Sequence, residues 1–201
     1  DALSELFDVH LLTGSEVLKS RMIPEADYIV TGSMGGLLAM ELLPESCKKL
    51  VLISSTAKFC SIEGYPCGTP EKVLRRMIMQ LKRDPESVLD AFLRNVHFPF
   101  RESRQAISMR KNVPVDLDDL VAGLEYLLDS DVRDKVSGIR IPVLLMHGSE
   151  DRIIPSTASE WLHAHLPNST LKIIEDDGHA LPAHHFAAVM QEMKAFLVRQ
   201  P

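Results

Sequence analysis

Three polar side chains of this sequence have the types and the order of a nucleophilic acyl-transfer site. Ser33 stands in VTGSMGG, Asp151 in GSEDRIIP and His179 in DDGHALP. A serine hydroxyl is a weak nucleophile at neutral pH, so an imidazole has to take its proton. A carboxylate then has to hold that imidazole in the right tautomer. The set therefore predicts Ser33 as nucleophile, His179 as general base and Asp151 as the group that orients the base.

Each of these residues also has an ordinary structural explanation. A serine before a helix is most often an N-cap, and an aspartate after a strand is usually part of a turn. Most histidines lie at the surface or are satisfied within a core, and this chain has eight of them. The combination, with each member placed directly after an apolar run, is what favours the catalytic interpretation.

The runs before these side chains are predicted parallel strands. They cover residues 27–30, 141–148 and 171–175, and a further strand at 49–55 is apolar nearly throughout, as a buried parallel strand should be. The carboxyl ends of parallel strands share one edge of the sheet, where ligands bind. We therefore expect the three side chains to meet at that edge.

A tight turn is expected at Ser33, between its strand and a helix at 35–43. Such a turn exposes the hydroxyl and directs the next backbone N–H, that of Met34, toward an oxyanion. The glycines around the serine should permit close packing and unusual dihedral angles there. They are Gly32, Gly35 and Gly36.

A long helical segment interrupts the alternation of strands and helices. Helical patterns cover 70–84, 85–96, 101–112 and 116–130, with no strand pattern between them. We expect an α/β core made of residues 1–56 and 141–201, with a helical cap inserted over 57–140. The core should be a mostly parallel central sheet flanked by helices, with a short buried strand also at 7–12 and a closing helix over 183–199.

Composition and charge limit the classes of protein. The chain has 201 residues, 45% of them hydrophobic and 25% charged, and a formal net charge of -6. The negative charge argues against nucleic-acid binding. No apolar stretch reaches the roughly 18 residues of a membrane helix. Three cysteines without zinc-finger spacing argue against a disulfide framework or structural zinc. We expect a monomeric cytoplasmic protein that uses no metal or cofactor.

The charge is unevenly distributed. Residues 71–111 hold ten lysines and arginines against five acidic residues, whereas the rest of the chain is strongly acidic. A basic segment of an acidic protein can dock an acidic partner. The alternative is an ordinary solvated helical surface.

Several longer segments resemble the α/β-hydrolase family. They are GSMGGLLAMELLP, KKLVLISSTAKF, DLDDLVAGLEYLLDSDVRDKVSGIRIPVLLMHGSEDRIIP and DDGHALPAHH. Within that family the chain is similar to the capped esterases that cleave the methyl ester of pimeloyl-acyl-carrier protein in biotin synthesis. The stretch that begins at DLDDLVAGLEYL is the most specific part, whereas the three short motifs indicate only an α/β-hydrolase.

The resemblance implies a serine carboxylesterase in which the ester acylates Ser33 with loss of methanol and water then releases the free acid. The partner would be an acyl carrier protein, which is acidic and is contacted in the family by arginines of the cap. Arg94 and Arg104 stand where the family places such arginines, and Arg110 and Lys111 extend the basic patch. One exposed ion pair contributes only about 0–1 kcal/mol, so docking would need several.

Two departures from the family pattern leave other interpretations open. Thr31 stands where the Gly-x-Ser-x-Gly elbow has its first glycine, and no His-Gly motif, the mark of the loop with the second oxyanion donor, precedes Ser33. We expect that the first strand or strands and this loop lie upstream of Asp1. The alternatives are a general short-chain carboxylesterase, another small-molecule hydrolase, or a non-catalytic binding protein on the same fold.

Overall fold

Four parallel strands form the central sheet of the computed structural model, which describes residues 3–102 and 115–199. The strands are β1 (Tyr28–Gly32), β2 (Lys49–Ile53), β3 (Val143–Gly148) and β4 (Ser169–Ile174), and they lie side by side in that order. Val51 is the register partner of Val30 on one side and of Leu144 on the other. All three strand pairs are parallel, which confirms the predicted sheet class.

Both faces of the two central strands, β2 and β3, are buried, and successive residues alternate between them. Leu50 and Leu52 of β2 belong to one core cluster, whereas Val51 and Ile53 belong to the other. β3 alternates in the same way, and every residue of both strands is buried. A parallel sheet covered on both faces needs such continuous apolar strands, because neither face meets water.

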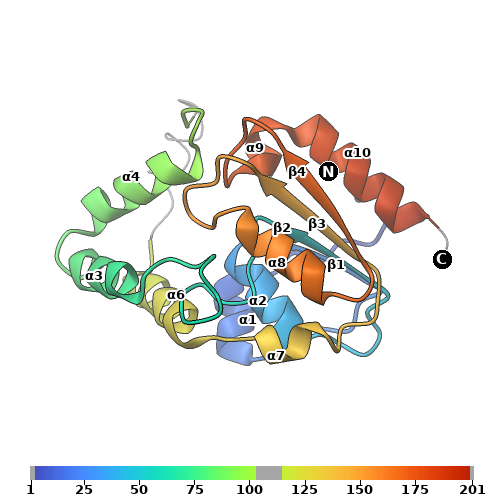
Figure 1. Ribbon diagram of the computed structural model, residues 1–201, viewed down its shortest axis with the longest axis horizontal. Helices are drawn as coiled ribbons and strands as arrows, with labels where there is room; N and C mark the ends of the chain where they lie inside the picture. The colour runs from blue at the N-terminus through green and yellow to red at the C-terminus, as the bar shows by residue number, and fades with distance from the viewer. Residues whose placement is uncertain (1–2, 103–114, 200–201) are drawn as a thin grey trace.

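Helices supply the other half of each cluster (Figure 1). On one face lie α2 (Met34–Glu41), α7 (Arg133–Val136) and α8 (Thr157–His165), which contribute apolar residues such as Leu37, Val136 and Leu162. On the other face lie α9 (Leu181–His184) and α10 (Phe186–Val198). α1 (Gly14–Ser20), begun by a capping box at Thr13, packs beside α2. The expected α/β-hydrolase architecture, a parallel sheet flanked by helices, is confirmed.

Three longer helices stand at the end of the molecule toward which the strands point (Figure 1). They are α3 (Glu71–Leu81), α4 (Pro85–Val96) and α6 (Leu117–Asp129). Asp84 and Asp116 cap α4 and α6 by accepting backbone N–H groups of the first turn. α6 is fastened to the core, since Tyr126 donates a hydrogen bond of 2.8 Å to Glu41 in α2. The division into a core of 1–56 and 141–201 and a cap of 57–140 stays a prediction.

The predicted strand at 7–12 is wrong. Residues 7–12 form no strand, and Leu11 is 85% exposed. Residues 10–12 line a cavity of about 480 Å³ together with residues of β1, and among the described residues none pairs with 7–12 in a ladder. An apolar run becomes a strand only where a partner satisfies its backbone.

Two predictions about helices have other outcomes. The closing helix is divided, because α9 ends before His185 and α10 begins after it. Most of the helix expected at 101–112 lies outside the described residues. Within the described ranges, no helix is both long enough and apolar enough to cross a membrane.

Candidate active site

Ser33 lies in a strained turn between β1 and α2. Its φ of 52° and ψ of -127° lie in a region that L-residues rarely adopt, at a cost of about 1–3 kcal/mol. Two contacts fix its backbone. The Ser33 N–H donates to the Ile53 carbonyl at 2.9 Å, and the Ser55 hydroxyl donates to the Ser33 carbonyl at 2.9 Å. The serine is no ordinary N-cap, since its side chain makes no capping hydrogen bond.

The neighbouring glycines permit close packing rather than the unusual dihedral angles. A Cβ at Gly35 would collide with the Thr31 hydroxyl, and one at Gly36 would collide with the Ser55 hydroxyl. Gly32 has no positive φ, so Ser33 itself adopts the strained conformation. Thr31 therefore fits because it lies within strand β1 and its hydroxyl occupies the space that Gly35 leaves.

Met34 is the first residue of α2, directly after Ser33. The first backbone N–H groups of an α-helix have no acceptor within the helix. They also carry the positive end of the helix dipole. The Met34 N–H is therefore available to a negative oxygen formed beside Ser33.

Asp151 and His179 are joined by a hydrogen bond of 2.7 Å between Oδ2 and Nδ1. The other carboxylate oxygen, Oδ1, accepts the backbone N–H groups of Ile153 at 2.7 Å and Ile154 at 3.0 Å. Burial alone would raise the pKa of Asp151, but hydrogen bonds from His147 and His179 lower it to about 2. Asp151 is therefore ionised at neutral pH and holds the His179 ring with its proton on Nδ1.

Two serines at the end of β2 bring this pair and Ser33 to the same edge of the sheet. Ser55 binds the backbone of Ser33, while Ser54 donates to the His179 carbonyl at 3.1 Å. Sequence reasoning treated both serines as strand residues, and their position after a buried apolar run was the available signal. Within the described part of the chain, the Ser33 hydroxyl forms no hydrogen bond, so it is free to meet a substrate.

A second carboxylate near His179, that of Asp177, binds other groups. Asp177 is fully buried and accepts hydrogen bonds from the Gly178 N–H and from Nδ1 of His185. The sequence gives no signal for this pair, because its members lie eight residues apart in a loop and at the start of a helix. Asp151 is thus the carboxylate that orients His179.

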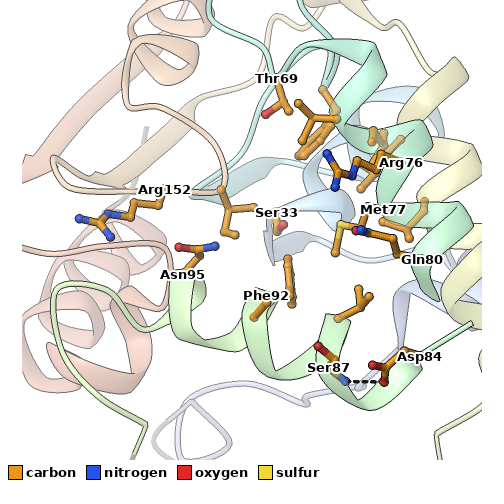
Figure 2. A pocket seen from close by; sticks show the side chains of 18 of the residues that line it. Ser33, Thr69, Arg76, Met77, Gln80, Asp84, Ser87, Phe92, Asn95 and Arg152 are labelled. Atoms are coloured by element: carbon orange, nitrogen blue, oxygen red, sulfur yellow. Dashed lines mark hydrogen bonds between the residues drawn. The ribbon is translucent and has the colours of Figure 1, made fainter.

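A cavity of about 640 Å³ opens above Ser33 between α3 and α4. Figure 2 shows the Ser33 side chain facing this space, with Met77 and Arg76 of α3 and Phe92 of α4 around it. Most of the wall is apolar, and the polar lining residues include Arg76, Gln80, Arg83, Asp84, Ser87, Asn95 and Arg152. The volume lies within the usual range of small-molecule sites, about 300–1,000 Å³.

The end of α4 is bound to the loop that carries His179. The Ala180 N–H donates to the Val96 carbonyl at 3.1 Å, and His97 and His184 are hydrogen-bonded at 3.1 Å. Among the residues proposed to dock a partner, Arg94 lies in the last turn of α4 and is exposed. Arg104, Arg110 and Lys111 lie outside the described residues. In residues 3–102 and 115–199, no group of three or more His, Cys, Asp and Glu side chains could hold a metal ion.

Comparison with known proteins identifies the family. The pattern of the α/β hydrolase fold family matches residues 22–185. The chain belongs to the α/β-hydrolase family. It is 34% identical over 175 residues to a protein of Nitrosomonas europaea named pimeloyl-[acyl-carrier protein] methyl ester esterase, which covers 83% of this chain and 69% of that protein. An Aromatoleum aromaticum protein of the same name is 30% identical over 181 residues, 82% of this chain and 72% of its own.

Solved structures agree on the fold. An esterase from Exiguobacterium antarcticum superposes with a TM-score of 0.78 at 23% identity, over 85% of this chain and 66% of that one. A bromoperoxidase from Bacillus anthracis superposes equally well at 19% identity, over 86% of this chain and 67% of its own. The chain thus spans about two thirds of the length of such proteins. The named relatives confirm the enzyme class expected from the sequence, a carboxylic ester hydrolase.

Proposed function

We propose that the protein is a serine carboxylesterase in which Ser33, His179 and Asp151 act as a catalytic triad. The observation that carries the proposal is the strained Ser33, which faces a cavity at the edge of the sheet where Asp151 binds His179. Backbone strain of this kind persists where a function requires it. A plain strand-to-helix turn would not need it.

The reaction has two steps. His179 takes the Ser33 proton through Nε2 as Oγ attacks the ester carbonyl, and the Met34 N–H stabilises the oxyanion. The protonated His179 then gives its proton to the departing alkoxide. The alkoxide leaves as an alcohol, and the acyl group remains on Ser33. Water, deprotonated by His179, attacks the acyl group; the bond to Ser33 Oγ then breaks, His179 returns the proton to Oγ, and the free acid is released. Asp151 stabilises the imidazolium in both steps.

The most suitable substrate is the methyl ester of pimeloyl-acyl-carrier protein, with general short-chain esters as the alternative. The cavity supports an acyl chain, because its walls are mostly apolar and Ser33 lies at its base. Polar residues such as Arg76 and Asn95 among the walls suit the carbonyl and amide groups that follow such a chain. The relatives of highest identity named above bear this activity in their names.

Hydrolysis of that ester by the full-length protein, with Ser33→Ala as the blank, tests the proposal. Rapid release of the free acid by the wild-type protein alone supports both the triad and the substrate. Cleavage of p-nitrophenyl butyrate without release from the carrier-protein ester leaves a general esterase. If a fluorophosphonate fails to label Ser33 and neither ester is cleaved, the protein is a non-catalytic binder.

A further inference from the structure

His147 is a buried histidine with no part in the steps above. It lies in β3, four residues before Asp151, and neither side chain has exposed surface. Nε2 of His147 lies 3.0 Å from Oδ2 of Asp151, the same oxygen that binds His179. A fully enclosed polar ring needs a partner at each nitrogen. The contacts of His147 therefore fix what it can do.

The neighbours of His147 determine where its proton lies. Nε2 is also 2.8 Å from the Ile154 carbonyl, which can only accept, so Nε2 carries a hydrogen. Nδ1 is 2.7 Å from the hydroxyl of Ser159, which is itself buried and can donate to it. A neutral ring with its proton on Nε2 satisfies all three contacts. In either protonation state that keeps this hydrogen, His147 thus donates to Asp151 through Nε2.

We propose that His147 is a positioning residue that tunes the base strength of His179 through Asp151. This inference rests on the proposed triad. Two donors on one carboxylate oxygen share its negative charge, so His179 meets a weaker anion than Asp151 alone would present. His147 also binds the same oxygen of Asp151, which helps to keep Oδ2 in place beside Nδ1 of His179. The proton on Nδ1 of His179 is thereby held toward Oδ2.

Other titratable groups near His179 are engaged elsewhere. Asp177, from the same loop, binds His185, and His184 binds His97 at the end of α4. Arg152, in the loop after β3, stacks over the Phe98 ring. On α8, which packs against β3, the residue that faces His147 is the uncharged Ser159. Asp151 is thus the charged group that couples His147 to His179.

The test replaces His147 and follows the titration of His179. In the full-length protein labelled with ¹³C at histidine Cε1, the His179 signal is assigned by its loss in His179→Gln. His147→Leu removes the donor, so we expect the pKa of His179 to rise by about 0.5–1 pH unit. The acidic limb of kcat/KM should move upward by the same amount, which lowers kcat/KM on that limb about 3- to 10-fold. His147→Gln should reverse both changes, because its amide N–H can reach the position of Nε2–H.

A merely structural role predicts a different pattern. It would lower the stability of His147→Leu and leave the titration of His179 in place, which is the result that overturns the proposal. His163→Leu is the matched control, since His163 is exposed and binds Ser169 far from the site. If His147→Leu does not fold, His147→Asn replaces it, since its shorter amide cannot reach Asp151. The titration does not depend on turnover, so it tests the role of His147 by itself. Activity that persists in Ser33→Ala would overturn the proposed function instead.

Discussion

Ser33 combines a reactive hydroxyl with a backbone conformation that glycine would adopt more easily. The φ of 52° strains any residue with a Cβ. We expect Ser33→Gly to be about 1 kcal/mol more stable than Ser33→Ala, because both lack the hydroxyl and only alanine keeps the strain. Urea unfolding of the two variants gives this difference. Equal stabilities would mean that the turn stores no strain.

Both variants, like His179→Ala, should lose at least about 10³-fold in kcat, as other triad enzymes do. Steady-state kinetics with a small ester measures the loss. Circular dichroism shows whether the fold is retained. Near-wild-type activity in any of the three would refute the triad.

Asp151 links the site to acid stability. Its pKa in the folded protein is about 2, below the ordinary aspartate value of about 3.9 in an unfolded chain. Its ionised form therefore stabilises the fold above pH 4, and this contribution disappears as the pH falls toward 2. We expect a contribution on the order of 2 kcal/mol at neutral pH.

The measurement is urea unfolding of wild type and Asp151→Asn between pH 2 and 7. The difference between them should shrink as the pH falls. Asp8→Asn is the control, because the Asp8 side chain is 91% exposed. A difference that does not change with pH would contradict the assigned ionisation.

How far the site could be read from the sequence depends on what each residue contacts. Ser33, Asp151 and His179 could be found because each follows a strand and the strand ends share one edge. His147 could not, since it lies within the apolar run VLLMHG and its partner Ser159 comes from a later helix. Periodicity identifies a strand but does not say which of its polar side chains will meet another element.

At the scale of elements, β1 and α2 meet through Thr31 and Gly35. A Cβ at Gly35 would collide with the Thr31 hydroxyl, whereas the Thr31 Cβ is 3.5 Å away, an ordinary contact. We therefore expect Gly35→Ala to destabilise the protein by about 1–3 kcal/mol, the usual cost of overpacking. In a Thr31→Ala background the cost should be much smaller.

A double-mutant cycle by urea unfolding tests this coupling. Thr31→Ser is the control background, because it keeps the hydroxyl that causes the collision. Additive effects of Gly35→Ala and Thr31→Ala would show that the two residues do not compete for one space. The coupling would also explain how the elbow accepts threonine at the first glycine of the Gly-x-Ser-x-Gly pattern.

The sequence was a poorer guide where an element needs a distant partner. Strands 49–55 and 141–148 were predicted because a strand that is apolar on both faces has few alternatives. The run at 7–12 also carries four apolar residues, yet it forms no strand and Leu11 and Leu12 remain exposed beside β1. Apolar side chains indicate that a segment can be buried. Whether it is buried as a strand depends on a neighbouring strand to pair with.

At the scale of the whole molecule, charge separates the α3–α4 helices from the acidic remainder. The exposed cations are Lys72 and Arg76 of α3, Lys82 and Arg83 in the turn between the two helices, and Arg94 of α4. Arg75 is already paired with Glu71 at 2.6 Å. Two of the exposed cations, Arg76 and Arg83, also line the cavity, so the cations form a basic surface beside it, which suits an acidic carrier protein.

Reversal of charge on this surface separates docking from chemistry. We expect Arg94→Glu to raise KM for a carrier-protein ester about 3- to 10-fold, since each exposed pair is worth about 1 kcal/mol and reversal adds repulsion. KM for p-nitrophenyl butyrate should not change, because Arg94 lies outside the residues that line the cavity.

The control is Arg140→Glu, an equal change of charge at an exposed arginine before β3. Raised salt should weaken the wild-type preference for the carrier-protein ester and leave the Arg94→Glu variant nearly unaffected, because screening acts on an attraction that this variant has lost. An equal rise of KM for both esters would place the effect in the fold rather than in docking. If Arg140→Glu raises KM for the carrier-protein ester equally, the effect comes from the net charge of the protein and not from the basic surface.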